Sequence, residues 1–255
     1  MKLKREIEEN DKLFFNQIFK KYSSKDFDIN TKIYRDFINN FIFENFIINN
    51  YNKILMMEVG CGIGSTSRLI SNYNIDYIGI DYSKELIKIA KKNFETDKIK
   101  FKCLNIKDSN YHNLADIIFM NGALHHMTDL DLVLHKFEEI LKVDGCVIAL
   151  EPLDNNLLFK FFRIIRKKID KNYSSDQFFF DYTLINKIFK NKNIEHEVIP
   201  FGFFTPPLAQ IKLPFKLNII FFKVFSFLDT IIYKYFPMFI QKYSWNVIIK
   251  FRYKK

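Results

Sequence analysis

Short apolar runs alternate with stripes of helical spacing along the first 150 residues. Five runs have the length and composition of buried strands: Ile54–Val59, Tyr77–Asp81, Ile99–Cys103, Asp116–Met120 and Cys146–Leu150. Between them, apolar residues recur three or four positions apart, which predicts helices. Strands that alternate with helices favour right-handed crossovers and a parallel sheet, with ligands at the carboxyl ends of the strands. The pattern therefore predicts an α/β fold.

Two of the predicted helices begin at residues suited to capping. Ser83 precedes a helix whose inward positions are Leu86, Ile87, Ala90 and Phe94. Thr128, followed three residues later by Asp131, predicts a capping box. The helix after it has the apolar stripe Leu130, Leu134, Phe137 and Leu141. The turn residues Asp144 and Gly145 then lead into the run at 146–150.

Residues 1–50 are predicted to be N-terminal helices of the same domain. Helical spacing spans Glu6–Lys21 and Asn30–Asn50, and these helices are expected to cover one sheet edge and the ligand entrance. Core packing without chemistry is the favoured interpretation of this region.

The C-terminal part adds elements to the sheet and interrupts it with an insertion. A helix at Thr183–Lys190, a strand at Ile194–Phe201 and a last strand at Trp245–Tyr253 are predicted from spacing and β-rich composition. The α/β domain is thus expected to comprise residues 51–202 and 245–255, with a hydrophobic, basic helical insertion at 203–244.

A glycine cluster follows the first predicted strand. Gly60, Gly62 and Gly64 are three of only seven glycines in the chain. Glycine accepts positive φ and lets a ligand approach the backbone, and the helix predicted at Ser65–Ser71 would turn its unpaired N–H groups toward that ligand. Asp81 ends the second strand, 21 residues after Gly60, where a carboxylate can hold ribose hydroxyls. These features predict a nucleotide-type ligand.

Successive motifs in this region resemble those of class I S-adenosylmethionine-dependent methyltransferases. The resemblance rests on Glu58, the G-x-G-x-G spacing, Asp81 and the segment Ala115–His126, and it covers Lys53 to about Pro152. It is closest to the broad small-molecule and lipid branch called type 11. The resemblance implies a Rossmann-like doubly wound sheet, mostly parallel with an antiparallel last strand, and S-adenosylmethionine as the cofactor.

The resemblance also implies which residues surround the cofactor. The amino-acid moiety is expected against Glu58, Gly60, Cys61, Gly62 and Gly64, the ribose on Asp81, and the methionine end near Asn121. Tyr82 belongs to the same predicted set. In the family an acidic residue and a small residue flank the adenine, and Asn105 with Ile106 occupies that place here, with asparagine in place of the usual aspartate.

His125, His126 and Glu151 are the candidates for catalysis. His126 matches the common histidine of the family, whereas His125 stands where related quinone O-methyltransferases have a glutamate that is sometimes linked with a metal; no metal site is therefore predicted. Histidine titrates near neutral pH, and Glu151 ends the fifth strand facing the same pocket, where it could orient an acceptor hydroxyl or amine. Structural roles remain open for all three: helix capping or pocket lining for the imidazoles, and a solvated strand-end carboxylate for Glu151.

Charge is distributed unevenly along the 255 residues, whose formal net charge is +10. Residues 1–150 contain 21 basic and 21 acidic residues, whereas residues 151–255 contain 18 basic and 8 acidic ones. The three cysteines fit no disulfide or metal spacing, which favours a reducing, cytoplasmic compartment. The N-terminus is too charged for a signal peptide.

Two basic amphipathic stretches lie in the C-terminal part, at 157–171 and 205–244. In the second, Pro214 suits a helix start and Pro237 a helix stop, and between them the polar strip is narrow. No run reaches the roughly 18 uncharged apolar residues of a spanning helix. Both stretches leave the ligand-binding rim, so they are predicted to dock the active site against an anionic membrane. A lid, extra core or a homodimer face is the alternative.

The expected function is methyl transfer from S-adenosylmethionine to a small-molecule acceptor that is hydrophobic or lipid-linked, at the cytoplasmic face of the membrane. A soluble acceptor is one alternative. An NAD-dependent oxidoreductase is another, although it would have G-x-G-x-x-G spacing. Nucleic acid is not an expected partner, because the C-terminal lysines interleave with apolar faces rather than lining a polar groove. The sequence does not specify an oligomeric state.

Overall fold

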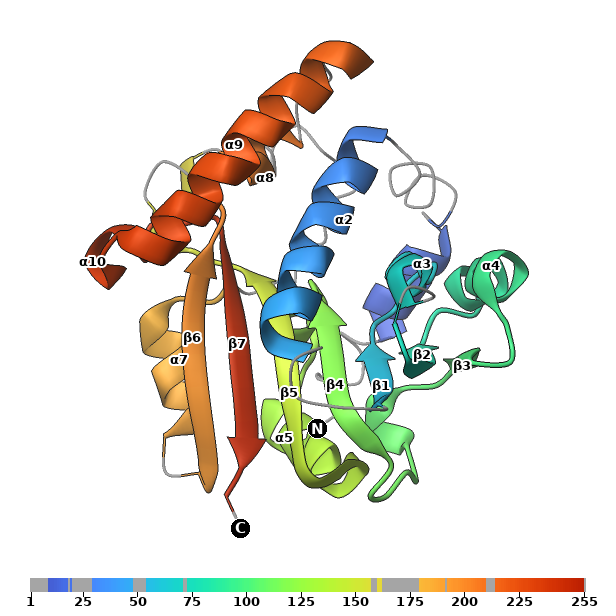
Figure 1. Ribbon diagram of the computed structural model, residues 1–255. Coiled ribbons are helices and arrows are strands. Elements are labelled where there is room, and N and C mark those ends of the chain that lie inside the picture. Colours follow the sequence, from blue (N-terminus) through green and yellow to red (C-terminus); the bar gives the residue numbers. More distant parts are fainter. Residues whose placement is uncertain are drawn as a thin grey trace.

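The structure is a computed structural model, and it describes residues 9–17, 19, 29–47, 54–70, 73–156, 160–161, 179–190, 192–209 and 214–254. A seven-stranded sheet with the order β3-β2-β1-β4-β5-β7-β6 lies at its centre (Figure 1). Its strands are β1 (Ile54–Val59), β2 (Ile75–Asp81), β3 (Ile99–Cys103), β4 (Ala115–Asn121), β5 (Leu141–Pro152), β6 (Ile194–Phe201) and β7 (Asn246–Tyr253). Strands β1 to β5 pair in parallel, and β7 is antiparallel to both of its neighbours. The predicted fold class is confirmed.

Helices cover both faces of the sheet. One face packs against α2 (Ile29–Ile42), the π-helical turn Phe43–Ile47, α3 (Ser67–Ile70) and α4 (Lys84–Phe94). The other packs against α5 (Leu130–Ile140) and α7 (Tyr182–Phe189). The central parallel strands β1 and β4 are largely buried on both faces, as expected for crossover topology, whereas the edge strand β3 exposes Lys100 and Lys102.

Of the two predicted caps, one is confirmed and one is wrong. Ser83 caps α4, and its Oγ accepts a hydrogen bond from the Leu86 N–H at 3.4 Å. The capping box does not form, because Asp129 takes the N-cap of α5 in a left-handed conformation (φ 58°) without a side-chain cap bond. Thr128 instead accepts a hydrogen bond from the Lys107 Nζ, and Asp131 pairs with Lys192.

Strand β5 begins earlier than predicted, at Leu141, which the helical stripe had included. Leu141 pairs with Ala115 and Cys146 pairs with Ile117, so the pairing register shifts between them. Asp144 has a positive φ of 70° within this irregular stretch. The sequence pattern indicates the turn residues. It does not indicate that β5 pairs with β4 both before and after them.

Between β6 and β7 the described residues form three helices: α8 (Thr205–Leu208), α9 (Phe215–Tyr235) and α10 (Met238–Gln241). Helix α9 extends across the end of the sheet toward which β4 points (Figure 1). Its start after Pro214 and its end before Pro237 agree with the predicted boundaries. The division into a domain and an insertion stays a prediction.

Parts of other predicted helices fall outside the described residues. Of Glu6–Lys21, residues 9–17 are helical, and of Asn30–Asn50, residues 48–50 are not described. The basic amphipathic stretch 157–171 is described only at Lys160 and Phe161, which are helical. Within the described ranges, no helix has both the length and the apolar character needed to cross a membrane.

Candidate functional site

The loop after β1 needs its glycines for both conformation and space. Gly60, Gly62 and Gly64 have φ values of 75°, 54° and 77°. A Cβ on Gly60 would lie 2.5 Å from that of Ala123, and one on Gly64 would lie 2.7 Å from the Phe101 ring. The helix predicted from Ser65 is shorter than expected, because residues 62–66 form turns and α3 begins at Ser67. The loop is therefore held close to the ends of β2, β3 and β4.

Asp81 connects the end of β2 to this loop. Its Oδ2 accepts a hydrogen bond from the Gly62 N–H at 3.0 Å, and its Oδ1 accepts one from the Ser83 N–H at 2.8 Å. The side chain is buried, and burial raises its pKa from 3.8 to about 6 against the opposing effect of these two bonds. A carboxylate has about four acceptor positions, so two remain for a ligand.

Glu58 lies beneath the loop rather than at its surface. Its Oε1 accepts a hydrogen bond from the Thr66 hydroxyl at 2.9 Å, and its Oε2 accepts one from the Tyr77 hydroxyl. Burial raises the pKa of Glu58 to about 7, and it raises the pKa of Tyr77 well above its ordinary value. Glu58 thus fastens the loop to the middle of β2. Neither Thr66 nor Tyr77 stands out in the sequence.

The other predicted cofactor residues surround the loop. The Cys61 thiol is buried, its sulfur lies 3.8 Å from the Gly62 carbonyl oxygen, and burial raises its pKa. Tyr82 is half-buried and makes an edge contact with Phe15. Asn105 caps the short helix Ile106–Asp108, its Oδ1 accepting from the Lys107 N–H, while Ile106 is buried. The Cys61 N–H donates to the Ile80 carbonyl oxygen at 3.1 Å, which attaches this part of the loop to β2.

Asn121, at the end of β4, has a partner that the sequence does not reveal. Its Nδ2 donates to the Oδ1 of Asn39 on α2 at 3.1 Å, across 82 positions in the chain. Asn39 is buried, and its own Nδ2 has no hydrogen-bond partner among the described residues. A buried amide without a partner is costly, which makes this N–H₂ a candidate ligand contact.

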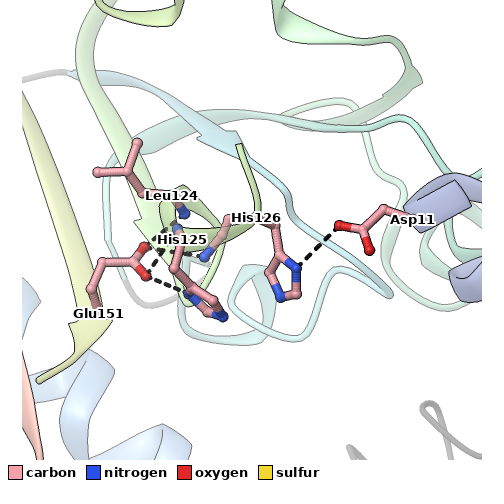
Figure 2. A network of polar contacts seen from close by, with 6 residues as sticks. Asp11, Leu124, His125, His126 and Glu151 are labelled. Atoms are coloured by element: carbon pink, nitrogen blue, oxygen red, sulfur yellow. Dashed lines mark hydrogen bonds and ion pairs between the residues drawn. The ribbon is translucent and has the colours of Figure 1, made fainter. Parts of the chain in front are cut away.

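Glu151 and His125 form a buried pair at the ends of β5 and β4. Nδ1 of His125 lies 2.6 Å from Oε2 of Glu151 (Figure 2), and because a carboxylate only accepts, this nitrogen is the protonated one. Glu151 also accepts bonds from the backbone N–H groups of Ala123, Leu124 and His125. Its four acceptor positions are thereby used. Glu151 is not the solvated carboxylate that the sequence left open, and it has no position left to bind an acceptor.

His126 points the other way, toward the N-terminal helical residues. Its Nδ1 lies 3.4 Å from the Oδ2 of Asp11, which Figure 2 shows on a separate helix. Burial lowers the pKa of His126 more than the Asp11 carboxylate raises it. Phe15, one turn further along, makes edge contacts with His126 and Tyr82. Residues 9–17 therefore cover the end of the sheet where the predicted site residues gather, as expected for the N-terminal helices.

Across the described ranges, no three His, Cys, Asp or Glu side chains come together in a group that could hold a metal ion. The polar groups that do gather at the carboxyl ends of β1, β2, β4 and β5 suit a ligand with hydroxyl, amine and carboxylate groups.

The comparisons with known proteins agree with this geometry. Residues 57–147 match the family model described as "Methyltransferase domain". The chain is 25% identical over 173 residues to a malonyl-[acyl-carrier protein] O-methyltransferase of Acetivibrio thermocellus, covering 65% of this chain and 60% of that protein. It is 25% identical over 115 residues to a ubiquinone biosynthesis O-methyltransferase of Pelagibacter ubique, covering 44% of this chain and 48% of the relative.

A solved structure from Thermotoga maritima shares the fold over nearly its whole length. It is described as an S-adenosylmethionine-dependent methyltransferase, possibly a histamine N-methyltransferase. The TM-score is 0.62 at 13% identity, and the match covers 94% of this chain and 99% of that one. The predicted likeness to a methyltransferase domain is confirmed over residues 57–147, and the structural likeness confirms the fold. The chain spans 60% and 48% of the two curated relatives.

Proposed function

We propose that this protein transfers a methyl group from S-adenosylmethionine to an oxygen of a small-molecule acceptor that is hydrophobic or lipid-linked and is met at the cytoplasmic membrane face. The observation that supports this proposal best is Asp81, which braces the glycine loop and keeps two acceptor positions for ribose hydroxyls. The family match argues against the NAD-dependent alternative.

The reaction requires alignment above all. The acceptor oxygen attacks the methyl carbon as the carbon–sulfur bond breaks, and the positive charge of the sulfonium disappears. Holding the two reactants in line can lower the barrier by about 7 to 11 kcal/mol. The rigid loop, pinned by Glu58 from below and by Asp81 from the side, supplies a fixed cofactor position.

The cofactor residues then divide by role. The backbone of residues 60–64 would line the amino-acid moiety, and Asn105 with Ile106 would flank the adenine. Asn121 and Asn39 would meet the methionine end, where the Nδ2 of Asn39 gains the partner it lacks. Glu58 acts indirectly in this arrangement, because its carboxylate is buried beneath the loop and holds Thr66 and Tyr77.

His125 is suited to receive the acceptor's proton. With Nδ1–H held by Glu151, the lone pair of His125 lies on Nε2. General-base catalysis of this kind contributes about 10² to 10⁴-fold. Glu151 is a positioning residue, since it fixes the tautomer and the loop that bears the imidazole. His126, paired with Asp11, would line the entrance.

The names of the relatives favour methyl transfer to an oxygen of an acceptor that is hydrophobic or attached to a carrier protein. One is named for a malonyl group on an acyl carrier protein and the other for ubiquinone biosynthesis, and both are named O-methyltransferases. An acceptor of that class is consistent with the apolar helix α9, which packs against α2, the helix that carries Asn39.

Calorimetric titration tests the proposal directly. We expect heat of binding with S-adenosylmethionine and none with NAD. Asp81→Ala should weaken binding about a hundredfold, because two hydrogen bonds to a charged group are lost. Asp97→Ala, at an exposed position before β3, is the control and should bind as the wild type does. An unchanged affinity for Asp81→Ala, or no binding by the wild type, would refute the assignment.

A further inference from the structure

Helix α9 buries two polar side chains, Asn218 and Asp229, and exposes several large apolar ones. Asp229 is 1% exposed, whereas Phe227, two residues earlier, is 65% exposed. A surface helix normally buries its apolar stripe and exposes its polar face. This departure from the usual pattern indicates that the outward face of α9 is covered by something other than water.

The inward face is firmly attached to the domain. Asp229 accepts hydrogen bonds from the backbone N–H groups of Phe203, Phe204 and Thr205 and from the Thr205 hydroxyl, at 2.6 to 3.0 Å. Phe222 makes an edge contact with Phe37 of α2. Because the inner side is fixed in this way, the outer side cannot be hidden by rotating the helix.

The outward face forms a continuous apolar surface, which we call the α9 stripe. Its five exposed members recur at helical spacing: Leu217, Ile220, Phe221, Val224 and Phe227. Met238 and Phe239 of the next helix, α10, are exposed as well. Contiguous exposed apolar surface on a protein marks an interaction site more often than chance.

Charge along the stripe indicates what covers it. Lys216, Lys223 and Lys234 are exposed and follow one edge of the stripe at intervals of seven and eleven residues, about two and three helical turns. The single acidic residue between 214 and 243 is Asp229, which is buried. An apolar face with a basic edge and no exposed acid complements an anionic bilayer, whose acyl region takes the stripe and whose headgroups meet the lysines.

We propose that the α9 stripe and its lysine edge bind the surface of an anionic lipid bilayer, with the helix lying in the plane of the interface. Figure 1 shows α9 beside α2 at the sheet end that bears the candidate site, so this orientation turns the site toward the lipid. The inference deepens the proposed function and rests on it only for the hydrophobic acceptor. It specifies the partner surface and the residues that contact it.

Vesicle co-sedimentation of the full chain tests this inference. We expect binding to vesicles of phosphatidylcholine with phosphatidylglycerol, weaker binding to phosphatidylcholine alone, and a decrease with added salt. Val224→Asp with Phe227→Asp should abolish binding. Val143→Asp, at a site 68% exposed on β5, adds one negative charge away from the stripe and should leave binding intact.

A second pair of variants tests the lysine edge. Lys223→Ala with Lys234→Ala should lower the partition coefficient about thirtyfold, since each basic residue near an anionic surface contributes about 1 kcal/mol. Lys98→Ala with Lys100→Ala removes the same charge from exposed positions around β3 and should have little effect.

Three outcomes would overturn the inference. They are absence of binding to anionic vesicles, binding that survives Val224→Asp with Phe227→Asp, and a dimer in solution that this double variant dissociates while vesicles bind nothing. Titration with S-adenosylmethionine on the same preparations separates the two proposals. Cofactor binding without vesicle binding refutes the docking surface alone, and vesicle binding without cofactor binding refutes the methyltransferase assignment.

Discussion

The burial of polar and apolar side chains differs between the carboxyl ends of the parallel strands and helix α9. At the strand ends, the carboxylates of Glu58, Asp81 and Glu151 are buried. On α9, large apolar side chains such as Phe227 face outward. Both arrangements cost free energy in an isolated chain in water, because buried charge and exposed hydrocarbon are each unfavourable.

The difference suggests what each region is built to contact. Burial raises the pKa of Glu58 to about 7 and that of Asp81 to about 6, and this cost maintains a preformed polar site for a ligand. The exposed hydrocarbon of α9 is stabilised only when another apolar surface covers it. Asp229 joins the two regions, since it attaches α9 to the turn that follows β6.

The largest expected effect is that of His125→Ala on turnover. Removal of the proposed base should lower kcat by about 10² to 10⁴-fold for a hydroxyl acceptor. Affinity for S-adenosylmethionine and vesicle binding should be unchanged, which would separate the chemical region from the α9 region. A methyl-transfer assay across pH, with Glu151→Gln as the companion variant, measures this. An unaltered kcat for His125→Ala would assign the imidazole a structural role.

Glu58 should make stability depend on pH. The folded protein retains the Glu58 proton up to about pH 7, whereas an unfolded chain releases it near 4.5. Stability from this group is therefore complete below 4.5 and is lost as pH rises through 7, by up to about 3 kcal/mol. Asp81 acts in the same direction between 3.8 and about 6.

Urea denaturation at several pH values measures this slope. Glu58→Gln should flatten the decrease between mildly acidic and neutral pH, because the amide does not titrate. Glu95→Gln, exposed at the end of α4, should keep the wild-type slope. Parallel slopes for wild type and Glu58→Gln would contradict the prediction.

Asp229→Asn should destabilise the junction between the two regions. The amide keeps one acceptor oxygen, so two of the four donors at residues 203–205 lose their partner, at a cost of about 2 to 3 kcal/mol. Asp181→Asn, at the N-cap of α7, should cost well under about 1 kcal/mol, because asparagine caps a helix about as well as aspartate does. Free energies of unfolding from chemical denaturation provide the comparison, and equal losses would argue against the special role of Asp229.

The smallest expected effect is that of Asn39→Ala on the cofactor. If the Nδ2 of Asn39 binds the methionine end, the variant should bind S-adenosylmethionine about two- to tenfold more weakly, which corresponds to one hydrogen bond. Asn40→Ala, the next position on α2, is the matched control. Calorimetric affinities identical to wild type for both variants would remove Asn39 from the site.

The sequence predicts the strands well because their apolar runs are short and are bounded by glycine or polar residues. It also indicates Asp81 and the glycine loop, whose requirements are local. Asn39 and Asp229 could not be found in this way, since each joins elements distant in the chain. The capping box was wrong for a local reason, the left-handed Asp129, which the spacing does not reveal.

Glu151 illustrates the same limit at the site. Its position at a strand end could be read from the sequence, but its four hydrogen-bond donors could not. With all four acceptor positions in use, Glu151 orients His125 and does not contact the methyl acceptor.

The place of β7 between β5 and β6 has a consequence for biosynthesis. Strand β6 pairs with β7 alone, and 45 positions separate the end of β6 from the start of β7. At about 5 to 20 residues per second, a ribosome needs some seconds to make that stretch, during which β6 has no ladder to join. Helix α9 is translated within this interval, so its apolar surface leaves the ribosome before the sheet closes.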